Sequence, residues 1–313
     1  MKKILITGGA GFIGTNLTKE LLKNKNEIFC IDNFYSSSKK NIEQFRNNKR
    51  FHFIHHDVIK PIKINKKIDQ IYNLACPASP IHYQRDPIYT MKTNVVGAFN
   101  ICEFAKKNNC SLLQASTSEI YGDPDVHPQK ESYNGNVNTL GPRSCYDEGK
   151  RSAETIIYDY YKIFKLNIKI ARIFNTYGPF MQQNDGRVVS NFIVNALKQK
   201  KIIINGQGKQ TRSFCYIDDL VIALIKLMNK NSKFNGPFNI GNPEEYNVRQ
   251  LASIVLKLTK SKSKIHYSKM QLNDPKKRKP DISKFSKNYK WKPKISLDDG
   301  LLKTIKYFKE RQS

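Results

Sequence analysis

The sequence predicts an α/β fold, with a doubly wound parallel sheet followed by a smaller α/β region. In the first half, short β-like runs alternate with helical stretches, which is typical of βαβ units whose parallel sheet is covered by helices on both faces. After about Gly178 this alternation loosens. We therefore expect a main unit over 1–178, to which part of 213–242 returns, and a smaller unit over 179–313.

Six short runs in the first half are predicted to be strands, joined by right-handed crossovers. They are Ile4–Thr7, Glu27–Ile31, Phe51–Ile54, Gln70–Leu74, Leu112–Ser116 and Ile168–Arg172. The helices predicted between them are Ile13–Lys23, Ser38–Phe45, Pro87–Lys107 and Cys145–Phe164.

The second half has shorter β-runs and four further helical patterns. The β-runs are Ile202–Ile204, Phe214–Ile217 and Pro237–Ile240. The helices are Val188–Gln199, Asp218–Met228, Val248–Leu258 and Leu297–Phe308. We expect this region to interleave with the main sheet and to carry substrate specificity.

The composition is that of a globular protein, with 39% hydrophobic and 11% aromatic residues in 313. No run approaches the roughly 20 apolar residues of a membrane span, and the opening segment lacks the features of a signal peptide. We therefore expect a cytoplasmic protein with no membrane partner, whose six scattered cysteines stay reduced.

The net charge of +28 is large, but its lysines are spread from Lys2 to Lys309 rather than clustered. Nucleic-acid binding usually needs a basic patch on one face, so we expect no nucleic acid. A positive field would also attract a small polyanionic substrate. The six histidines show no ligand spacing, and no metal site is predicted.

A glycine-rich turn follows the first predicted strand and opens the first helix. Gly8 permits the tight turn, Gly11 lets the backbone approach a pyrophosphate, and Gly14 allows close packing of helix on strand. The helix start at Phe12 and Ile13 offers free N–H groups and the positive end of the helix dipole. This context predicts a Rossmann-type dinucleotide site.

Acidic and polar residues after the next strands complete this site. Asp32 ends the second strand, where a carboxylate can accept both ribose hydroxyls and would repel a 2′-phosphate, so NAD is favoured over NADP. Asn33 follows it, and Asp57-Val58 follows the third strand, where a side chain could meet the adenine. A helix cap is the alternative for Asp57. Asn94 lies in a predicted helix and could face the sheet.

A tyrosine and a lysine four residues apart begin another predicted helix. The spacing puts Tyr146 and Lys150 on one face. A tyrosine has a pKa near ~10, so it can act as a base near neutrality only if a cation stabilises its phenolate. Lys150 can supply that cation, aided by the positive charge of a nicotinamide.

The segment Ser116–Gly122 ends the fifth strand, where an open parallel sheet binds its ligands. Thr117 could donate a hydrogen bond to the reacting oxygen, and Glu119 would share its face if the chain stays extended. Ser118 would then point away unless the chain turns. The alternative for Thr117 to Glu119 is capping of the following loop.

Together, the glycine turn, Thr117, Tyr146 and Lys150 resemble the extended short-chain dehydrogenase/reductase superfamily. Longer blocks resemble, within it, the UDP-glucuronate decarboxylase (UDP-xylose synthase) family, over essentially Lys3 to Phe308. These blocks are Leu74–Pro80 with His82–Gln84, Ser116–Pro124 with His127–Gln129, Gly141–Arg151, Ala171–Pro179, Asn184–Phe192 and Arg278–Ile282.

The resemblance implies a Rossmann fold with bound NAD and a catalytic set of Thr117, Glu119, Tyr146, Lys150 and Arg278, the last close to the sugar. It implies a cofactor site made of Gly8, Gly11, Phe12, Ile13, Gly14, Asp32, Asn33, Asp57, Val58, Leu74 and Asn94, with Tyr146 and Lys150. It also implies that UDP is bound by Asn175, Arg187, Gln210, Arg212 and Tyr216.

Physical chemistry agrees with the last assignment, because two arginines can pair bidentately with a diphosphate. A surface salt bridge is the alternative for Arg212. The basic run Lys276–Lys279 also looks like a nuclear-localisation or nucleic-acid patch, but within the longer match it is interpreted as a substrate-site segment.

The chain departs from the family pattern at three positions. Phe180 stands where the family usually has arginine, and Asn134 and Asn136 replace a usual tryptophan and histidine. In the family these loops border the substrate cleft, so sugar preference is less firmly implied than the chemistry.

The implied reaction is NAD-dependent decarboxylation of UDP-glucuronate to UDP-xylose through a 4-keto intermediate. Three alternatives stay open: a decarboxylase that releases the UDP-4-keto-pentose, a UDP-glucuronate 4-epimerase, and a non-catalytic NAD-sensing or RNA-binding relative. The resemblance also implies a homodimer, in which helices near 87–107 and 145–164 pair with their copies. The apolar positions expected on that face are Val95, Phe99, Ile156, Tyr160 and Phe164.

Overall fold

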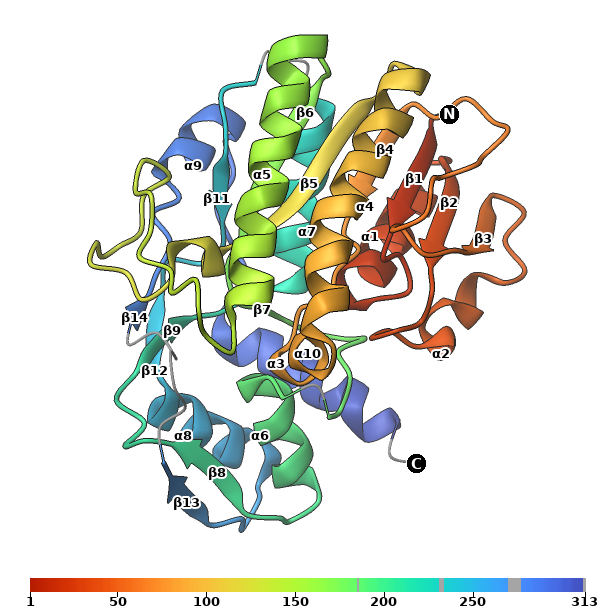
Figure 1. Cartoon of the computed structure of the whole chain (residues 1–313). Coiled ribbons are helices and arrows are strands. Elements are labelled where there is room, and N and C mark those ends of the chain that lie inside the picture. Colours follow the sequence, from red (N-terminus) through yellow and green to blue (C-terminus); the bar gives the residue numbers. More distant parts are fainter. Residues whose placement is uncertain (185, 231–233, 270–276, 312–313) are drawn as a thin grey trace.

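The structure is a computed structural model that describes residues 1–184, 186–230, 234–269 and 277–311. Its centre is a seven-stranded sheet in the order β11-β6-β5-β4-β1-β2-β3, in which every neighbouring pair is parallel (Figure 1). The strands are β1 (Lys3–Thr7), β2 (Glu27–Asp32), β3 (Phe51–His55), β4 (Gln70–Asn73), β5 (Ser111–Thr117), β6 (Ile168–Ile173) and β11 (Phe238–Ile240). The predicted α/β fold is confirmed, and each of the six predicted first-half strands lies within one residue of its expected ends.

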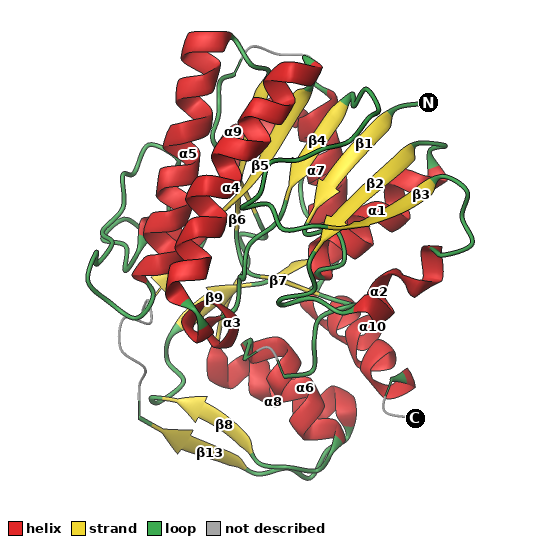
Figure 2. Ribbon diagram, turned by 45° about the vertical axis from the view of Figure 1, so that its right-hand side comes forward, coloured by secondary structure: helices red, strands yellow, loops and turns green. Residues whose placement is uncertain are grey.

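Helices cover both faces of this sheet, as Figures 1 and 2 show. Those on one face are α4 (Pro87–Asn108) and α5 (Ser144–Phe164), and those on the other are α1 (Phe12–Lys23) and α7 (Ile217–Asn229). The central strands β1 and β4 are buried along nearly their whole length, as expected for a parallel sheet covered on both sides. The short helix α2 (Lys39–Ile42) and a following 3-10 helix (Glu43–Phe45) lie between β2 and β3.

The chain leaves the main sheet after β6 and returns to it. A two-residue strand β7 (Thr176–Tyr177) pairs with β10 (Cys215–Tyr216), which leads directly into α7. Strand β11 then pairs with β6 at the edge of the main sheet. Residues 215–230 and 238–240 therefore pack with the first half of the chain, although they come from the second.

The smaller region lies beyond the carboxyl ends of the main strands, at the bottom of Figure 2. Its elements are α6 (Val188–Leu197), the parallel pair β8 (Ile202–Asn205) and β13 (Ile265–Ser268), α8 (Val248–Thr259) and α10 (Leu297–Glu310). Strand β9 (Thr211–Ser213) pairs with β12 (Glu245–Asn247) and β14 (Lys277–Arg278). The helices α3 (Pro80–Arg85) and α9 (Ser283–Tyr289) complete the chain.

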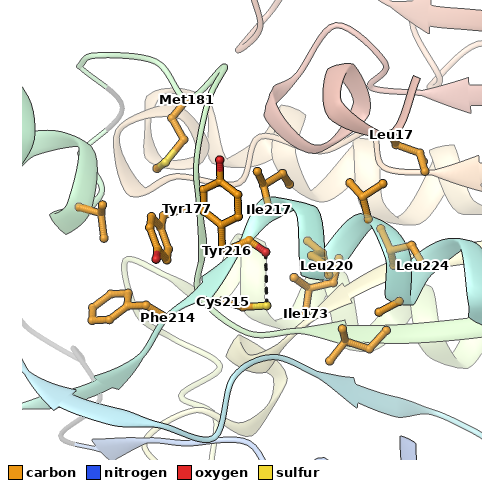
Figure 3. Close-up of a cluster of buried hydrophobic side chains, with 14 of the residues drawn as sticks. Leu17, Ile173, Tyr177, Met181, Phe214, Cys215, Tyr216, Ile217, Leu220 and Leu224 are labelled. Carbon is orange, nitrogen blue, oxygen red and sulfur yellow. Dashed lines mark hydrogen bonds between the residues drawn. The ribbon is translucent and has the colours of Figure 1, made fainter. Parts of the chain in front are cut away.

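One hydrophobic cluster runs through both parts of the molecule. It includes Leu17 of α1, Ile173 of β6 and Leu220 of α7, which Figure 3 shows together, and it continues to Leu251 of α8 and Leu301 of α10. A shared core of this kind fixes the smaller region against the sheet. None of the described helices is long and apolar enough to cross a membrane.

Candidate active site

A deep cleft opens at the carboxyl ends of the main strands, between the sheet and the smaller region. Residues that follow β1 to β5 and the start of α5 line one part of it, and residues after β6, at the start of α6 and from β8, β9 and β14 line much of the rest. This is the edge at which open α/β sheets bind their ligands. All but two of the site residues expected from the sequence line this cleft, the exceptions being Asn94 and Tyr216.

The glycine turn has the geometry that a dinucleotide requires. Gly8 has a φ of +66°, and a Cβ there would lie 2.9 Å from the backbone of Ala75. A Cβ on Gly14 would lie 2.5 Å from the carbonyl oxygen of Gly8, so only glycine lets α1 approach the turn. Helix α1 begins at Phe12 without a side-chain cap, which leaves its first amides directed at the cleft for an anion.

Two carboxylates hold the loops beside this turn. Asp32 accepts hydrogen bonds from the backbone N–H of Ala10 at 3.0 Å and of Phe34 at 2.8 Å, and from the Ser37 hydroxyl at 2.7 Å. Burial raises the pKa of Asp32. Its carboxylate thus orders the loop in which a ribose would lie.

Asp57 accepts hydrogen bonds from the Asn33 side chain at 3.0 Å and from the Tyr89 hydroxyl at 2.7 Å. It also accepts from the backbone N–H of Ile59 at 3.1 Å, two residues on, so it closes a turn rather than capping a helix.

Tyr146 and Lys150 lie one turn apart on α5 and are both buried. The Lys150 Nζ donates to the carbonyl oxygen of Ala115 at 2.9 Å and lies 5.8 Å from the centre of the Tyr146 ring. Burial raises the pKa of Tyr146 above its usual range, whereas a hydrogen bond with Thr117 acts to lower it. Burial likewise lowers the pKa of Lys150. A buried phenol, a hydroxyl and an ammonium therefore converge where β5 ends.

The chain turns immediately after Thr117. Residues Ser118–Tyr121 form a 3-10 helix, and the Thr117 hydroxyl accepts from the backbone N–H of Glu119 at 3.3 Å. Because the chain does not stay extended, Ser118 also lines the cleft. Thr117 therefore both caps the following 3-10 helix and hydrogen-bonds with Tyr146.

Glu119 is clamped by two arginines. Arg278 donates through both terminal nitrogens, Nη2 to Oε2 at 2.8 Å and Nη1 to Oε1, and Arg143 donates from Nη2 to Oε2. Burial alone would raise the pKa of Glu119, but the guanidiniums of Arg278 and Arg143 hold it well below its usual range. Asp147 lies 3.8 Å from Arg143, and burial, followed by the charge of Glu119, raises the pKa of Asp147. The cleft thus holds a fixed carboxylate between two cations.

On the substrate side, Asn175, Arg187, Gln210 and Arg212 line the cleft. Arg212 is buried, with 6% of its surface exposed, which rules out an exposed surface salt bridge for this side chain. Strand β14 buries Arg278 and exposes Lys277, so the basic run does not form one continuous patch. Lys276 lies outside the described residues.

Two expected site residues lie elsewhere. Tyr216 belongs to the hydrophobic core, where its ring packs edge-on against Tyr177 at 5.6 Å. Asn94 lies between α5 and the end of β4: its Nδ2 donates to the carbonyl oxygen of Thr90 at 3.1 Å, a Cβ on Gly149 would lie 2.8 Å from that nitrogen, and the side chain also hydrogen-bonds with Cys76 after β4. Asn94 therefore does not line the cleft itself but contacts Cys76, which does.

Three further residues in the cleft were given no role from the sequence. The Tyr83 ring stacks on that of Tyr146, with centres 5.1 Å apart and 9° between planes. Arg143 stands one turn before Tyr146, and Gln182 lies on the loop after β7. The first two fall inside the family-like blocks, which was the only sequence signal for them.

The three departures from the family pattern are placed differently. Phe180 lines the cleft. Asn134 and Asn136 do not; the carbonyl oxygen of Asn134 accepts from Arg151 at 2.7 Å, and Asn136 forms a backbone bridge with Gly122.

Throughout the described ranges, no three His, Cys, Asp or Glu side chains come together as a metal ion would need.

A family model and several known proteins match this chain over nearly its whole length. The family model described as GDP-mannose 4,6 dehydratase matches residues 5–304. UDP-glucuronic acid decarboxylase 1 of Xenopus tropicalis is 48% identical over 309 residues, covering 99% of this chain and 72% of its own length. UDP-glucuronic acid decarboxylase 6 of Arabidopsis thaliana is 50% identical over 300 residues, covering 96% of this chain and 86% of its own.

Two solved structures show the same fold. UDP-glucuronic acid 4-epimerase of Bacillus cereus, in complex with UDP-glucuronic acid and NAD, is 29% identical with a TM-score of 0.89, covering 99% of each chain. UDP-glucose 4-epimerase of Thermotoga maritima, with UDP-glucose, is 27% identical with a TM-score of 0.90, covering 99% of this chain and 100% of its own.

Proposed function

Because this chain belongs to the GDP-mannose 4,6-dehydratase family and, within it, to the UDP-glucuronic acid decarboxylases, we propose that it converts UDP-glucuronate to UDP-xylose with NAD as its resident cofactor. The family resemblance predicted from the sequence is confirmed. The observation that carries the proposal is the meeting of Thr117, Tyr146 and Lys150 with the Glu119–Arg278 pair in one cleft.

The residues present fit NAD. The glycine turn leaves no room for side chains beside the first amides of α1, which suits a pyrophosphate. Asp32 lies where a carboxylate would accept ribose hydroxyls, and Tyr146 and Lys150 lie at the far end of the same cleft. When bound, NAD supplies the hydride acceptor for oxidation at C4 and, once reduced, the hydride donor.

The protein's own groups account for the remaining steps. Tyr146, hydrogen-bonded to Thr117, is the base that takes the proton of the C4 hydroxyl, and the nearby Lys150 ammonium stabilises the phenolate. Oxidation at C4 makes a β-keto acid, from which carbon dioxide leaves because its electron pair becomes an enolate conjugated with the ketone. Thr117 and the protonated Tyr146 stabilise charge at that oxygen. C5 of the enolate then takes up a proton, which gives the 4-keto pentose, and Tyr146 returns its proton to the C4 oxygen when that ketone is reduced. The clamped Glu119 and Arg278 hold the sugar in position for these steps.

A direct experiment is to incubate the protein with UDP-glucuronate and identify the products by mass spectrometry. We expect carbon dioxide and UDP-xylose. UDP-galacturonate without carbon dioxide would instead establish the 4-epimerase, a second candidate suggested by the Bacillus cereus neighbour that holds UDP-glucuronic acid and NAD. No conversion at all, with NAD still bound, would leave the non-catalytic alternative.

The preference for NAD is expected to depend on Asp32. Asp32→Ala should weaken NAD binding about tenfold or more and bring the affinities for NAD and NADP closer together, because the repulsion of a 2′-phosphate is removed. Titration calorimetry with each dinucleotide measures both values. Asp32→Asn keeps an acceptor without the charge and should also lessen the discrimination; an unchanged ratio of affinities in both variants would show that this carboxylate does not read the ribose.

We also propose a homodimer built on α4 and α5. Phe99 of α4 and Phe164 of α5 are 47% and 48% exposed, whereas Val95, Ile156 and Tyr160 are half-buried on the same pair of helices. Light scattering at micromolar concentration should give twice the chain mass of 36.2 kDa. Phe99→Glu should shift the protein towards monomer, and Tyr267→Glu, at an exposed position outside these helices, should not. A monomer in the unmodified protein would contradict the proposal.

A further inference from the structure

The segment Pro179–Gln182 crosses from the substrate side of the cleft to the cofactor side. Each of its four residues contacts a different part of the molecule. The carbonyl oxygen of Pro179 accepts a hydrogen bond from the Asn16 side chain of α1 at 2.9 Å, and Met181 is buried in the core. The Gln182 Nε2 donates to the carbonyl oxygen of Ser36 at 2.7 Å.

The bond between Gln182 and Ser36 joins opposite walls of the cleft. Both residues line it. Ser36 belongs to the loop that Asp32 orders through Phe34 and Ser37, and Gln182 follows β7 on the far side. A ligand held along the glycine turn and Asp32 would therefore lie in the same cleft as this bond.

The C-terminal helix reinforces the same closure. Phe180 adopts a positive φ of 71°, and its ring packs against Tyr307 at 5.3 Å and beneath the Arg311 guanidinium at 5.8 Å. Arg311 also donates to the Asn41 side chain at 3.4 Å, and Asn41 in turn donates to the carbonyl oxygen of Ala10 in the glycine turn at 3.0 Å. The end of α10 thus connects the segment to the turn itself.

Asn16 uses both protons of its amide. One is donated to the carbonyl oxygen of Phe12 at 2.9 Å, one turn earlier in α1, and the other to Pro179. The amide is therefore fixed by its own helix before it contacts the segment. Because both ends of this contact are already ordered, enclosing a ligand beneath it costs little additional conformational entropy.

We propose that Pro179–Gln182 is a strap that retains the reduced cofactor between the oxidation and the final reduction, and so decides that the product leaves as a pentose rather than as a keto sugar. This inference rests on the proposed function, since it concerns the fate of its intermediate. The bond from Gln182 to Ser36 is the main closure, and the bond from Asn16 to Pro179 holds the strap in place.

The test measures cofactor exchange and product partition separately. Protein loaded with radiolabelled NAD is mixed with excess unlabelled NAD, and the label that remains bound is followed with time. Gln182→Glu keeps the side-chain length but removes the donor, so we expect exchange to be about tenfold faster. Gln182→Ala should do the same. The double variant Asn16→Ala/Gln182→Ala should be faster still, and Gln207→Ala, at an exposed position that does not line the cleft, should match the unmodified protein.

With UDP-glucuronate, the variants with faster exchange should release a larger fraction of UDP-4-keto-pentose and an equal amount of NADH. Exchange within twofold of the unmodified rate in the folded double variant would overturn the strap, as would faster exchange with no added keto sugar from a protein that still releases carbon dioxide. Exchange needs no turnover, so an unmodified protein that releases no carbon dioxide would refute the proposed function without deciding the exchange result.

Discussion

Replacing Tyr146 by phenylalanine is expected to lower kcat for UDP-glucuronate by about 10³-fold while NAD and UDP still bind within a few-fold of their original affinities. Only the oxygen that accepts the C4 proton is lost. The ring can keep its stacking on Tyr83 and its buried place on α5, so folding and ligand binding have little reason to change. Steady-state rates and calorimetric titration with UDP and NAD measure the two effects.

A matched control for this variant is Tyr158→Phe, which removes a phenolic oxygen from an exposed position of the same helix. It should leave both the rate and the affinities unchanged. Retention of near-original activity by Tyr146→Phe would remove this tyrosine from the mechanism.

Arg278→Ala is expected to lower the rate of decarboxylation by about 10²-fold. Arg278 binds both oxygens of Glu119 at the edge of the cleft, and without it the buried carboxylate keeps, among the residues that the structure describes, only Arg143 as an ion-pair partner. The pKa of Glu119 should then rise, because the first of the two guanidiniums that hold it low is gone. A carboxylate held by one arginine instead of two positions the sugar less precisely. We therefore expect a larger change in kcat than in KM.

The neighbouring Lys277→Ala provides the control, because the same strand exposes Lys277 and buries Arg278. It should be near neutral. Equal losses from both substitutions, accompanied by steep dependence on salt, would indicate a general charged surface rather than a specific side chain.

The main sheet could be predicted from the sequence because its strands are apolar runs between recognisable helices. Runs such as Ile4–Thr7 and Ile168–Arg172 are buried by helices on both faces, so their pattern is local and strong. Strands β7 and β14, which were not predicted, have only two residues each. Each forms because a segment that is distant in the sequence lies beside it, and no local sequence pattern predicts such a pairing.

The helix α3 was not predicted either. It has six residues and starts at Pro80, and it is held by Thr90, which donates to the carbonyl oxygen of Tyr83 at 3.1 Å. So short a helix depends on tertiary contacts rather than on its own propensity.

The candidate site could likewise be predicted from the sequence only in part. Thr117, Asp32 and the glycine turn could be placed together because the carboxyl ends of parallel strands meet at one edge. Arg143 could not be paired with Glu119 in this way, since the contact depends on the turn that the chain makes at Ser118. For Tyr216, the β-run was found, but the sequence could not show that its side chain is directed into the core.

The central claim is that one carbon is oxidised and then reduced by the same cofactor within one site. Substrate that carries deuterium at C4 tests it most directly, with the products analysed by mass spectrometry and no NADH added. The account predicts carbon dioxide and UDP-xylose that still carries deuterium at C4, with no NADH accumulating in solution. Free UDP-4-keto-pentose with an equal amount of deuterated NADH in solution would contradict it.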